Sequence, residues 1–169
     1  ILSGMFLTMY YVPDVENAWK SVYYLQNEVA FGELVRGMHH WGASLVIVMM
    51  FLHTLRVFFT GSYKKPRELN WMVGVGLFGV MMGLGFTGYL LPWDMKALFA
   101  TKVGIEIAAS VPFLGEYIKI LLAGDSAILG AQTLTRFFAI HVFFLPAALF
   151  ALLAAHFIMI RKRGISGPL

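Results

Sequence analysis

Four of the five histidines lie on two segments with almost the same internal spacing. His39 and His53 are fourteen residues apart, and His141 and His156 are fifteen apart. On an α-helix, at about 100° per residue, these intervals return to within about 40° and 60° of the starting direction. The two histidines of each segment therefore lie on one face of a helix, about 21 Å apart along its axis.

If the two segments run in the same direction, His39 is level with His141 and His53 is level with His156. Each level then presents two imidazoles that can clamp a flat, iron-centred group between two helices. Two imidazoles fill both axial positions of a haem iron, which suits electron transfer. Zinc or copper is less favoured because neither level has a third ligand nearby. Packing histidines or a proton relay remain the alternatives, and His40 points about 100° away, toward the helix surface.

Glycines and arginines near these histidines agree with a haem. Gly74 and Gly88 are also fourteen residues apart, and a flat macrocycle against a helix needs positions without side chains. Helix packing through small residues is the alternative explanation for these glycines. Arg36 and Arg56 each lie three residues from a histidine. They could pair with haem propionates or extend to lipid headgroups.

The composition indicates a membrane protein with a single domain over residues 1–169. Apolar residues make up 59% of the chain, charged residues make up 13%, and the mean hydropathy is +0.75. A soluble chain has about 25% charged residues. These values exclude a disordered chain, a nucleic-acid-binding arm and an ordinary water-soluble enzyme. The absence of cysteine excludes an iron–sulfur centre or a thiolate metal site within these residues.

Hydropathy predicts an all-α transmembrane four-helix bundle with a truncated first helix. Three stretches reach the roughly 20 apolar residues that a spanning helix needs: Glu33–Phe59, Trp71–Leu91 and Thr133–Ile160. Ile1–Val12 is apolar but too short, and is predicted to be the last half of a helix that begins upstream. Between the third and fourth helices, short apolar runs such as Tyr117–Ala123 predict interfacial helices.

The basic residues predict the orientation of the bundle. One end carries a single acidic residue, Glu68, and seven basic ones: Arg56, Lys64, Lys65, Arg67, Arg161, Lys162 and Arg163. The other end carries the remaining six basic and eight acidic residues. The positive-inside rule therefore places the connection between the second and third segments, and the C-terminal end, in the cytoplasm.

Several motifs together resemble cytochrome b. They are RGMHHWGAS (36–44), YKKPRELNW (63–71), GFTGYLLPWD (85–94), TLTRFFAIH (133–141) and RKRGISGPL (161–169). The resemblance covers essentially the whole chain and is to the short b6-type N-terminal form of cytochrome b6f and bacterial menaquinol:cytochrome c reductases. The fifteen-residue interval is typical of the b6 type. The segment LPWDMKALFATKVG (91–104) is more similar to the bacterial menaquinol enzymes than to plant-type b6.

The resemblance implies four antiparallel helices that hold two b haems. It assigns His39 and His141 to a haem near the outer face, and His53 and His156 to one near the inner face. Three positions match the family's haem-facing glycines: Gly4, Gly74 and Gly88. Pro146, between two ligands of one helix, removes a backbone hydrogen bond and is expected to kink the helix and help accommodate the extra residue.

The resemblance also implies the reaction and the partners. Quinol is oxidised near the outer face, and one electron leaves through a Rieske iron–sulfur protein and a c-type cytochrome subunit. The other electron crosses to reduce quinone near the inner face. Tyr89, Pro92 and Trp93 are expected to contribute to the outer quinol site, whereas Asp94 is interpreted as a solvated loop acid. The site also needs a Pro-Glu-Trp-Tyr motif from a subunit with the remaining cytochrome b helices, within a dimeric complex in membrane lipid.

A third haem and the location follow from the same resemblance. In b6-type relatives an upstream cysteine holds a covalent c-type haem, and Arg161 matches the position that faces it. Arg161 could equally belong to the cytoplasmic positive belt. The bacterial plasma membrane is the expected location. The alternatives are cytochrome b6 of a thylakoid membrane, a haem-bearing anchor of a dehydrogenase, and a haem-free transporter or proton conduit.

Overall fold

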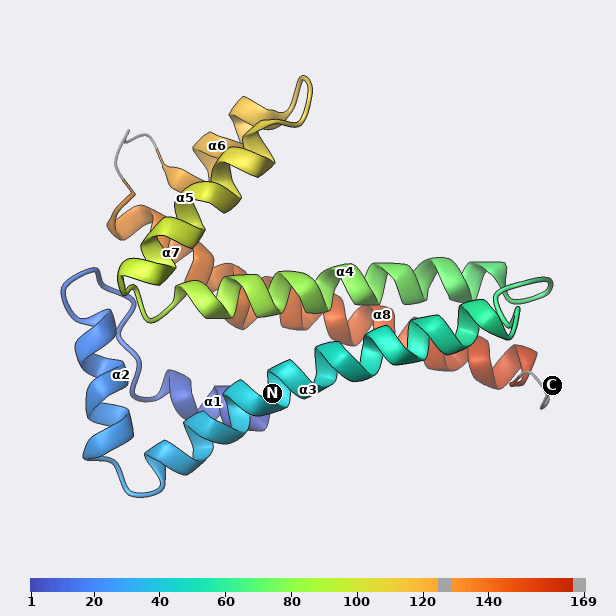
Figure 1. Cartoon of the computed structure of the whole chain (residues 1–169), viewed down its shortest axis with the longest axis horizontal. Helices are drawn as coiled ribbons and strands as arrows, with labels where there is room; N and C mark the ends of the chain where they lie inside the picture. Colours follow the sequence, from blue (N-terminus) through green and yellow to red (C-terminus); the bar gives the residue numbers. More distant parts are fainter. Residues whose placement is uncertain (125–128, 166–169) are drawn as a thin grey trace.

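The computed structural model describes residues 1–124 and 129–165, and the described chain is helical with connecting turns. Three helices are long and apolar enough to cross a membrane. They are α3 (Gly32–Phe59), α4 (Glu68–Leu90) and a continuous helix over Ala131–Arg163. Figure 1 shows them side by side along the long axis of the molecule. The predicted transmembrane helical fold is confirmed, with helix ends within a few residues of the predicted ones.

The last spanning helix contains an irregular turn that hydropathy did not reveal. It consists of α7 (Ala131–Ala139), a π-helical turn η1 (Ile140–Phe144) and α8 (Leu145–Arg163). Within η1 the Leu145 N–H donates to the Ile140 carbonyl, five residues back. Pro146 stands at the start of α8. Because proline has no N–H to donate, the normal α-helical ladder is interrupted at this point.

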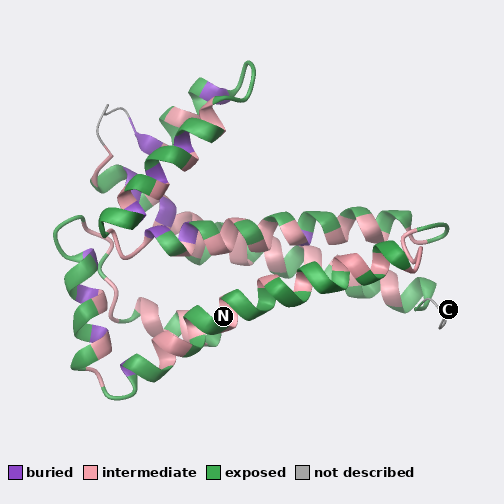
Figure 2. Cartoon of the chain, viewed as in Figure 1, coloured by how far each residue is buried: buried purple, intermediate pink, exposed green. Residues whose placement is uncertain are grey.

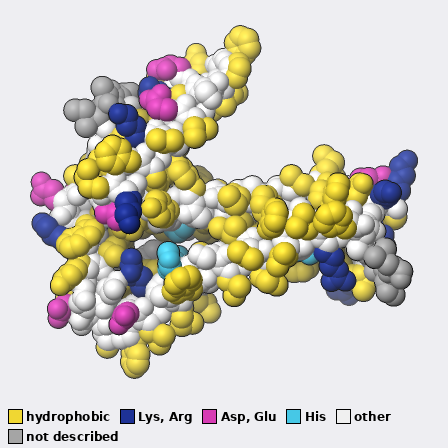
Figure 3. All heavy atoms as spheres, viewed as in Figure 1, with side chains coloured by type: hydrophobic (Ala, Val, Ile, Leu, Met, Phe, Trp, Pro, Cys, Tyr) yellow, Lys and Arg dark blue, Asp and Glu magenta, His cyan; other side chains and the backbone are white. Residues whose placement is uncertain are grey.

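Two ends of the bundle can be distinguished. The end predicted to face outward, named the outer end, holds the start of α3, the end of α4, and three short helices: α2 (Ala18–Asn27), α5 (Met95–Ala109) and α6 (Gly115–Ala123). The inner end holds the connection between α3 and α4 and the C-terminal end of α8 (Figure 1). Figure 3 shows basic side chains gathered at the inner end, in agreement with the charge count.

Helix α2 was not predicted because it is short and its apolar face is narrow. Ala18, Ser21 and Leu25 are its buried residues, and it packs against α3. The corner between the two helices requires Gly32, because a Cβ there would lie 1.9 Å from the Leu25 carbonyl oxygen. The residue before it, Phe31, adopts a left-handed conformation with φ 61°. These two residues set the direction in which α3 leaves the outer end.

The predicted helices between the third and fourth spans are α5 and α6, which form a hairpin at the outer end (Figure 1). Asp94 caps α5, because its Oδ1 accepts a hydrogen bond from the Ala97 N–H at 2.8 Å. Asp94 is exposed to solvent, as expected for a loop acid, and it also stabilises the start of α5 as its N-cap. Glu106 and Lys119 join the two helices by an ion pair of 3.0 Å.

The buried core is small and lies where this hairpin meets the bundle. Leu90, Ile105, Ala123 and Phe137 form it, one residue from each of four helices. Figure 2 shows buried residues concentrated there, while the long helices are mostly exposed. Exposed apolar helix faces are what lipid, neighbouring subunits or a prosthetic group would cover.

The first helix, α1 (Leu2–Thr8), is shorter than the predicted Ile1–Val12 and packs against α3. Helix α4 packs along α8 and also contacts α3. In contrast, α3 and α8 are not among the helix pairs whose backbones approach closely along the described chain. These two helices and the η1 turn carry the four histidines of the predicted site.

Candidate haem-binding site

The outer level brings together His39 on α3 and His141 in η1. Their ring centroids are 6.3 Å apart and the ring planes are inclined by 80°. Two imidazoles that each bind one metal through a nitrogen about 2 Å away have centroids about 6 Å apart. Figure 3 shows histidine side chains in the hollow between the helices at this end. The separation therefore fits one metal ion held between the two rings.

Hydroxyl groups hold the far nitrogens of both outer rings. Ser3 Oγ lies 3.1 Å from His39 Nδ1, and Thr87 Oγ1 lies 3.0 Å from His141 Nδ1. The Thr87 hydroxyl donates its proton to the Gly83 carbonyl at 2.8 Å, so it can only accept from Nδ1–H of His141. This tautomer leaves Nε2 of His141 unprotonated, as a metal ligand must be.

Two glycines make room for the outer rings. A Cβ on Gly88 would lie 2.6 Å from His141 Cε1, and one on Gly4 would lie 3.1 Å from His39 Cε1. The first distance is too short for any side chain, and the second is tight. These two predicted glycines therefore lie against the histidine rings themselves, so a side chain at either position would press on a ring even without a macrocycle.

The inner level is formed by His53 on α3 and His156 on α8. Both side chains lie toward the inner end, and no ring contact joins them among the described residues. Nδ1 of His156 is buried and makes no hydrogen bond to the described chain, although the Asn70 backbone is close by. Gly74 lies at ordinary contact distance, with its added Cβ 3.5 Å from His156 Cε1. This level is present but less completely supported than the outer one.

The described residues contain no group of three or more His, Cys, Asp or Glu side chains that could hold a bare metal ion. Each level instead offers two imidazoles. A metal bound there needs its other ligands from a prosthetic group, and a haem supplies four from its porphyrin. The separation of the outer rings and the glycines beside the rings at both levels fit a haem held between two histidines.

The π turn explains how histidines fourteen residues apart on one helix can be level with histidines fifteen residues apart on the other. A π turn accommodates one residue more than an α turn. The fifteen residues from His141 to His156 therefore cover about the same distance along the helix axis as fourteen α-helical residues, the interval between His39 and His53. Sequence analysis pointed to Pro146 but missed the π turn, because the hydropathy pattern is the same for both helix types.

The three predicted arginines lie near the expected levels without carboxylate partners among the described residues. Arg36 donates to the Gln26 side-chain oxygen on α2. Arg56 and Arg161 are exposed, toward the inner end. All three positive charges are available to an anionic group such as a haem propionate or a lipid headgroup.

Two of the predicted quinol residues, Pro92 and Trp93, lie in the turn after α4. Leu91 follows the last residue of that helix, Pro92 cannot continue it, and Trp93 has a positive φ of 52°. Tyr89 is exposed one turn earlier. The Tyr11 hydroxyl donates to the Leu91 carbonyl at 2.6 Å, and burial raises the pKa of Tyr11 above its ordinary value, so the hydroxyl keeps its proton. Sequence analysis did not identify Tyr11.

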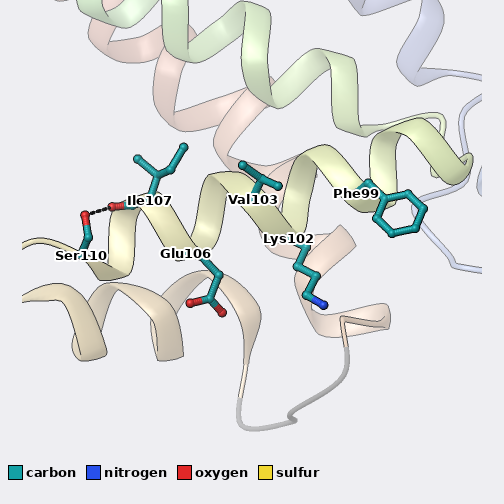
Figure 4. Close-up of a pocket in the computed structure, with 6 residues that line it drawn as sticks. All are labelled: Phe99, Lys102, Val103, Glu106, Ile107 and Ser110. Carbon is teal, nitrogen blue, oxygen red and sulfur yellow. Dashed lines mark hydrogen bonds between the residues drawn. The ribbon is translucent and has the colours of Figure 1, made fainter.

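An open groove on α5 lies apart from these residues (Figure 4). Its wall is mixed in polarity, and Ser110 Oγ donates to the Ile107 carbonyl at 2.7 Å within it. The lining residues are Phe99, Lys102, Val103, Glu106, Ile107 and Ser110. None of the residues predicted for the haem or quinol sites lines this groove.

Comparisons with known proteins identify the class to which this fold and site belong. The family model described as cytochrome b/b6/petB matches residues 1–164. The chain therefore belongs to the cytochrome b/b6 family, as its motifs predicted.

Within this family, the chain is more similar to menaquinol:cytochrome c reductase cytochrome b subunits than to cytochrome b6. It is 82% identical over 169 residues to the menaquinol:cytochrome c reductase cytochrome b subunit of Bacillus subtilis (strain 168), covering 100% of this chain and 75% of the relative. It is 48% identical over 168 residues to cytochrome b6 of Heliobacterium mobile, covering 99% of this chain and 78% of that protein.

A solved structure described as a hyperthermophilic respiratory complex III has the same fold. The TM-score is 0.88 at 32% sequence identity. The match covers 99% of this chain but only 45% of the other. The chain thus corresponds to less than half of that longer polypeptide.

Proposed function

We propose that the chain is the dihaem electron-transfer subunit of a quinol:cytochrome c reductase. The observation that carries this proposal is the 6.3 Å separation of His39 and His141, together with a second histidine pair at the inner level. A bound b haem would supply reversible one-electron chemistry with no open position on its iron. The chain's own part is to hold two such groups about 21 Å apart along the helices, across a core about 30 Å thick.

His39 and His141 would hold the outer haem, and His53 and His156 the inner one. Thr87 keeps Nδ1 of His141 protonated, which would leave Nε2 free to bind the haem iron. Gly4 and Gly88 allow both outer rings to lie against neighbouring helices. Arg36 and Arg56 would pair with haem carboxylates at their respective levels. These side chains position the acceptors and need not move during electron transfer.

The quinol is proposed to bind at the outer end, against Tyr89, Pro92 and Trp93. Its oxidation releases two electrons and two protons. One electron enters this chain and the other goes to a Rieske iron–sulfur protein and a c-type cytochrome subunit. A partner with the remaining cytochrome b helices would complete the pocket in a dimeric, lipid-embedded complex. Menaquinol is favoured as the substrate because the 82% identical relative is named for it.

The proposed location is a bacterial plasma membrane, with the inner end and the C-terminus in the cytoplasm. The basic residues at that end support this orientation. Quinone would be reduced near the inner haem. A third, covalent c-type haem is proposed beside it, anchored outside residues 1–169 because these contain no cysteine, with Arg161 facing it.

The test is a haem count on the purified complex. Acidified organic solvent removes b haems but leaves covalently bound haem on the protein. We expect two extractable haems per copy of this subunit, and one that stays on the full-length subunit in a denaturing gel. A colourless complex would contradict the electron-transfer function and favour a haem-free transporter. An unstained subunit with two extractable haems would contradict only the third haem.

A further inference from the structure

The turn after α4 is fixed at two points within its own segment. The Trp93 N–H donates to the Leu90 carbonyl at 3.2 Å. Asp94 then caps α5 through the Ala97 N–H. Pro92, between these bonds, has no N–H of its own. The Leu91 carbonyl lies at a helix end, where carbonyls have no partner within the helix.

Tyr11 satisfies that carbonyl from a distant part of the sequence. Its hydroxyl donates to Leu91 O at 2.6 Å, across eighty residues of sequence separation. The phenol is half-buried, and burial raises its pKa, so the hydroxyl remains a donor throughout the neutral and mildly alkaline range. The bond therefore does not depend on the pH at which the enzyme is assayed.

The ring of Tyr11 makes a second contact, to the helix that carries His141. It stacks on Phe138 with centroids 5.4 Å apart and ring planes inclined by 27°. Phe138 lies three residues before His141, which is about one helical turn. One side chain thus joins the Leu91–Trp93 turn to the segment with an outer histidine.

We propose that Tyr11 is a positioning residue of the outer quinol site. It fixes the Leu91–Trp93 turn relative to the helix that carries His141. This inference rests on the proposed function. The hydroxyl touches a backbone carbonyl and the ring touches Phe138, so Tyr11 acts through other residues and not on the quinol itself. Removing only the hydroxyl breaks the one bond from Tyr11 to the turn, while leaving the stacked ring and both histidines in place.

The test is Tyr11→Phe in the complete complex, with Tyr10→Phe as the matched control. Tyr10 is the neighbouring tyrosine, and its ring contacts Phe6 while its hydroxyl makes no hydrogen bond to the described residues. Steady-state kinetics with a soluble menaquinol analogue gives KM and kcat. Haem content and both haem midpoint potentials are measured on the same preparations.

We expect Tyr11→Phe to raise KM about three- to tenfold, the loss associated with one hydrogen bond, with kcat within about twofold. The factor should be constant between about pH 6 and pH 9, because the tyrosine does not ionise in this range. Haem content and potentials should match the wild type. Tyr10→Phe should leave KM unchanged.

An unchanged KM in Tyr11→Phe, or a loss of haem that accompanies the KM change, would overturn the inference. In the first case the hydroxyl has no role at the quinol site, and in the second its role is general to the fold. If the complex with Tyr11→Phe does not assemble, Phe138→Leu, which removes the ring that Tyr11 stacks on, is measured in the same assay. An unchanged KM in that variant also overturns the inference. A wild-type complex without quinol activity would instead contradict the proposed function, so the two failures are distinguishable.

Discussion

The outer and inner histidine levels have the same ligand set but different support. At the outer level, hydroxyls of Ser3 and Thr87 hold both Nδ1 atoms, and two glycines face the rings at short range. At the inner level, Nδ1 of His156 is buried without a hydrogen bond within the described chain. Matching ligand spacing therefore does not imply matching surroundings. The orientation and potential of each haem are expected to depend on different neighbours.

The largest expected effect comes from crowding the outer level with Gly88→Ala. The new Cβ would lie 2.6 Å from His141 Cε1, so the ring must move away from its observed position. We expect the outer haem to be lost, leaving about half of the extractable haem. Absorbance of the reduced complex measures this loss. Gly79→Ala on the same helix is the control, because nothing lies within 4 Å of its added Cβ.

The same substitution at the inner level, Gly74→Ala, sharpens the contrast. Its Cβ would lie 3.5 Å from His156 Cε1, an ordinary contact distance. We therefore expect Gly74→Ala to lose less haem than Gly88→Ala. Equal haem loss in Gly74→Ala and Gly88→Ala would show that the two levels tolerate crowding alike and would remove the distinction. Full haem content in both variants would do the same.

A smaller effect is expected from Thr87→Val, which keeps the side-chain volume but removes the acceptor for His141 Nδ1–H. Without that bond His141 is a weaker electron donor, so the oxidised iron is less stabilised and the outer midpoint potential rises. We expect a rise of tens of millivolts, where about 59 mV corresponds to a tenfold change for one electron. The inner potential should not change.

Potentiometric titration followed by visible absorbance measures both midpoints of this variant. Thr54→Val is the matched control, because Thr54 bonds only the Met50 carbonyl of its own helix. If Thr87→Val leaves the outer midpoint at the wild-type value, or shifts both midpoints equally, then Thr87 does not act specifically on the outer level.

Much of this architecture was predictable from the sequence because the relevant signals are periodic. Three hydropathy maxima predicted the spanning helices, and histidine intervals near four helical turns predicted which side chains are level. The motif around Pro92 indicated a break after α4, and the structure has it there. Such predictions need only helix geometry and the cost of polar groups in lipid.

The parts that were not predictable depend on contacts between distant segments. The bond of Tyr11 to Leu91 and the pairing of Thr87 with His141 join residues that no local pattern connects. Helix α2 is short, and three buried residues give a weak periodic signal. The π turn at Ile140–Phe144 depends on hydrogen-bond register, which side-chain polarity does not encode.

The central claim is that each haem has two histidine ligands, one from each of two helices. Substituting one ligand, His156→Leu, and measuring haem content and the reduced absorbance spectrum of the purified complex tests it most directly. His40→Leu is the control, since the side chain of His40 is exposed and its ring contacts Trp41 instead of the other histidines. The account predicts loss of the inner haem, with the outer haem retaining its spectrum and midpoint potential. Two fully retained haems with unchanged spectra in His156→Leu would contradict it.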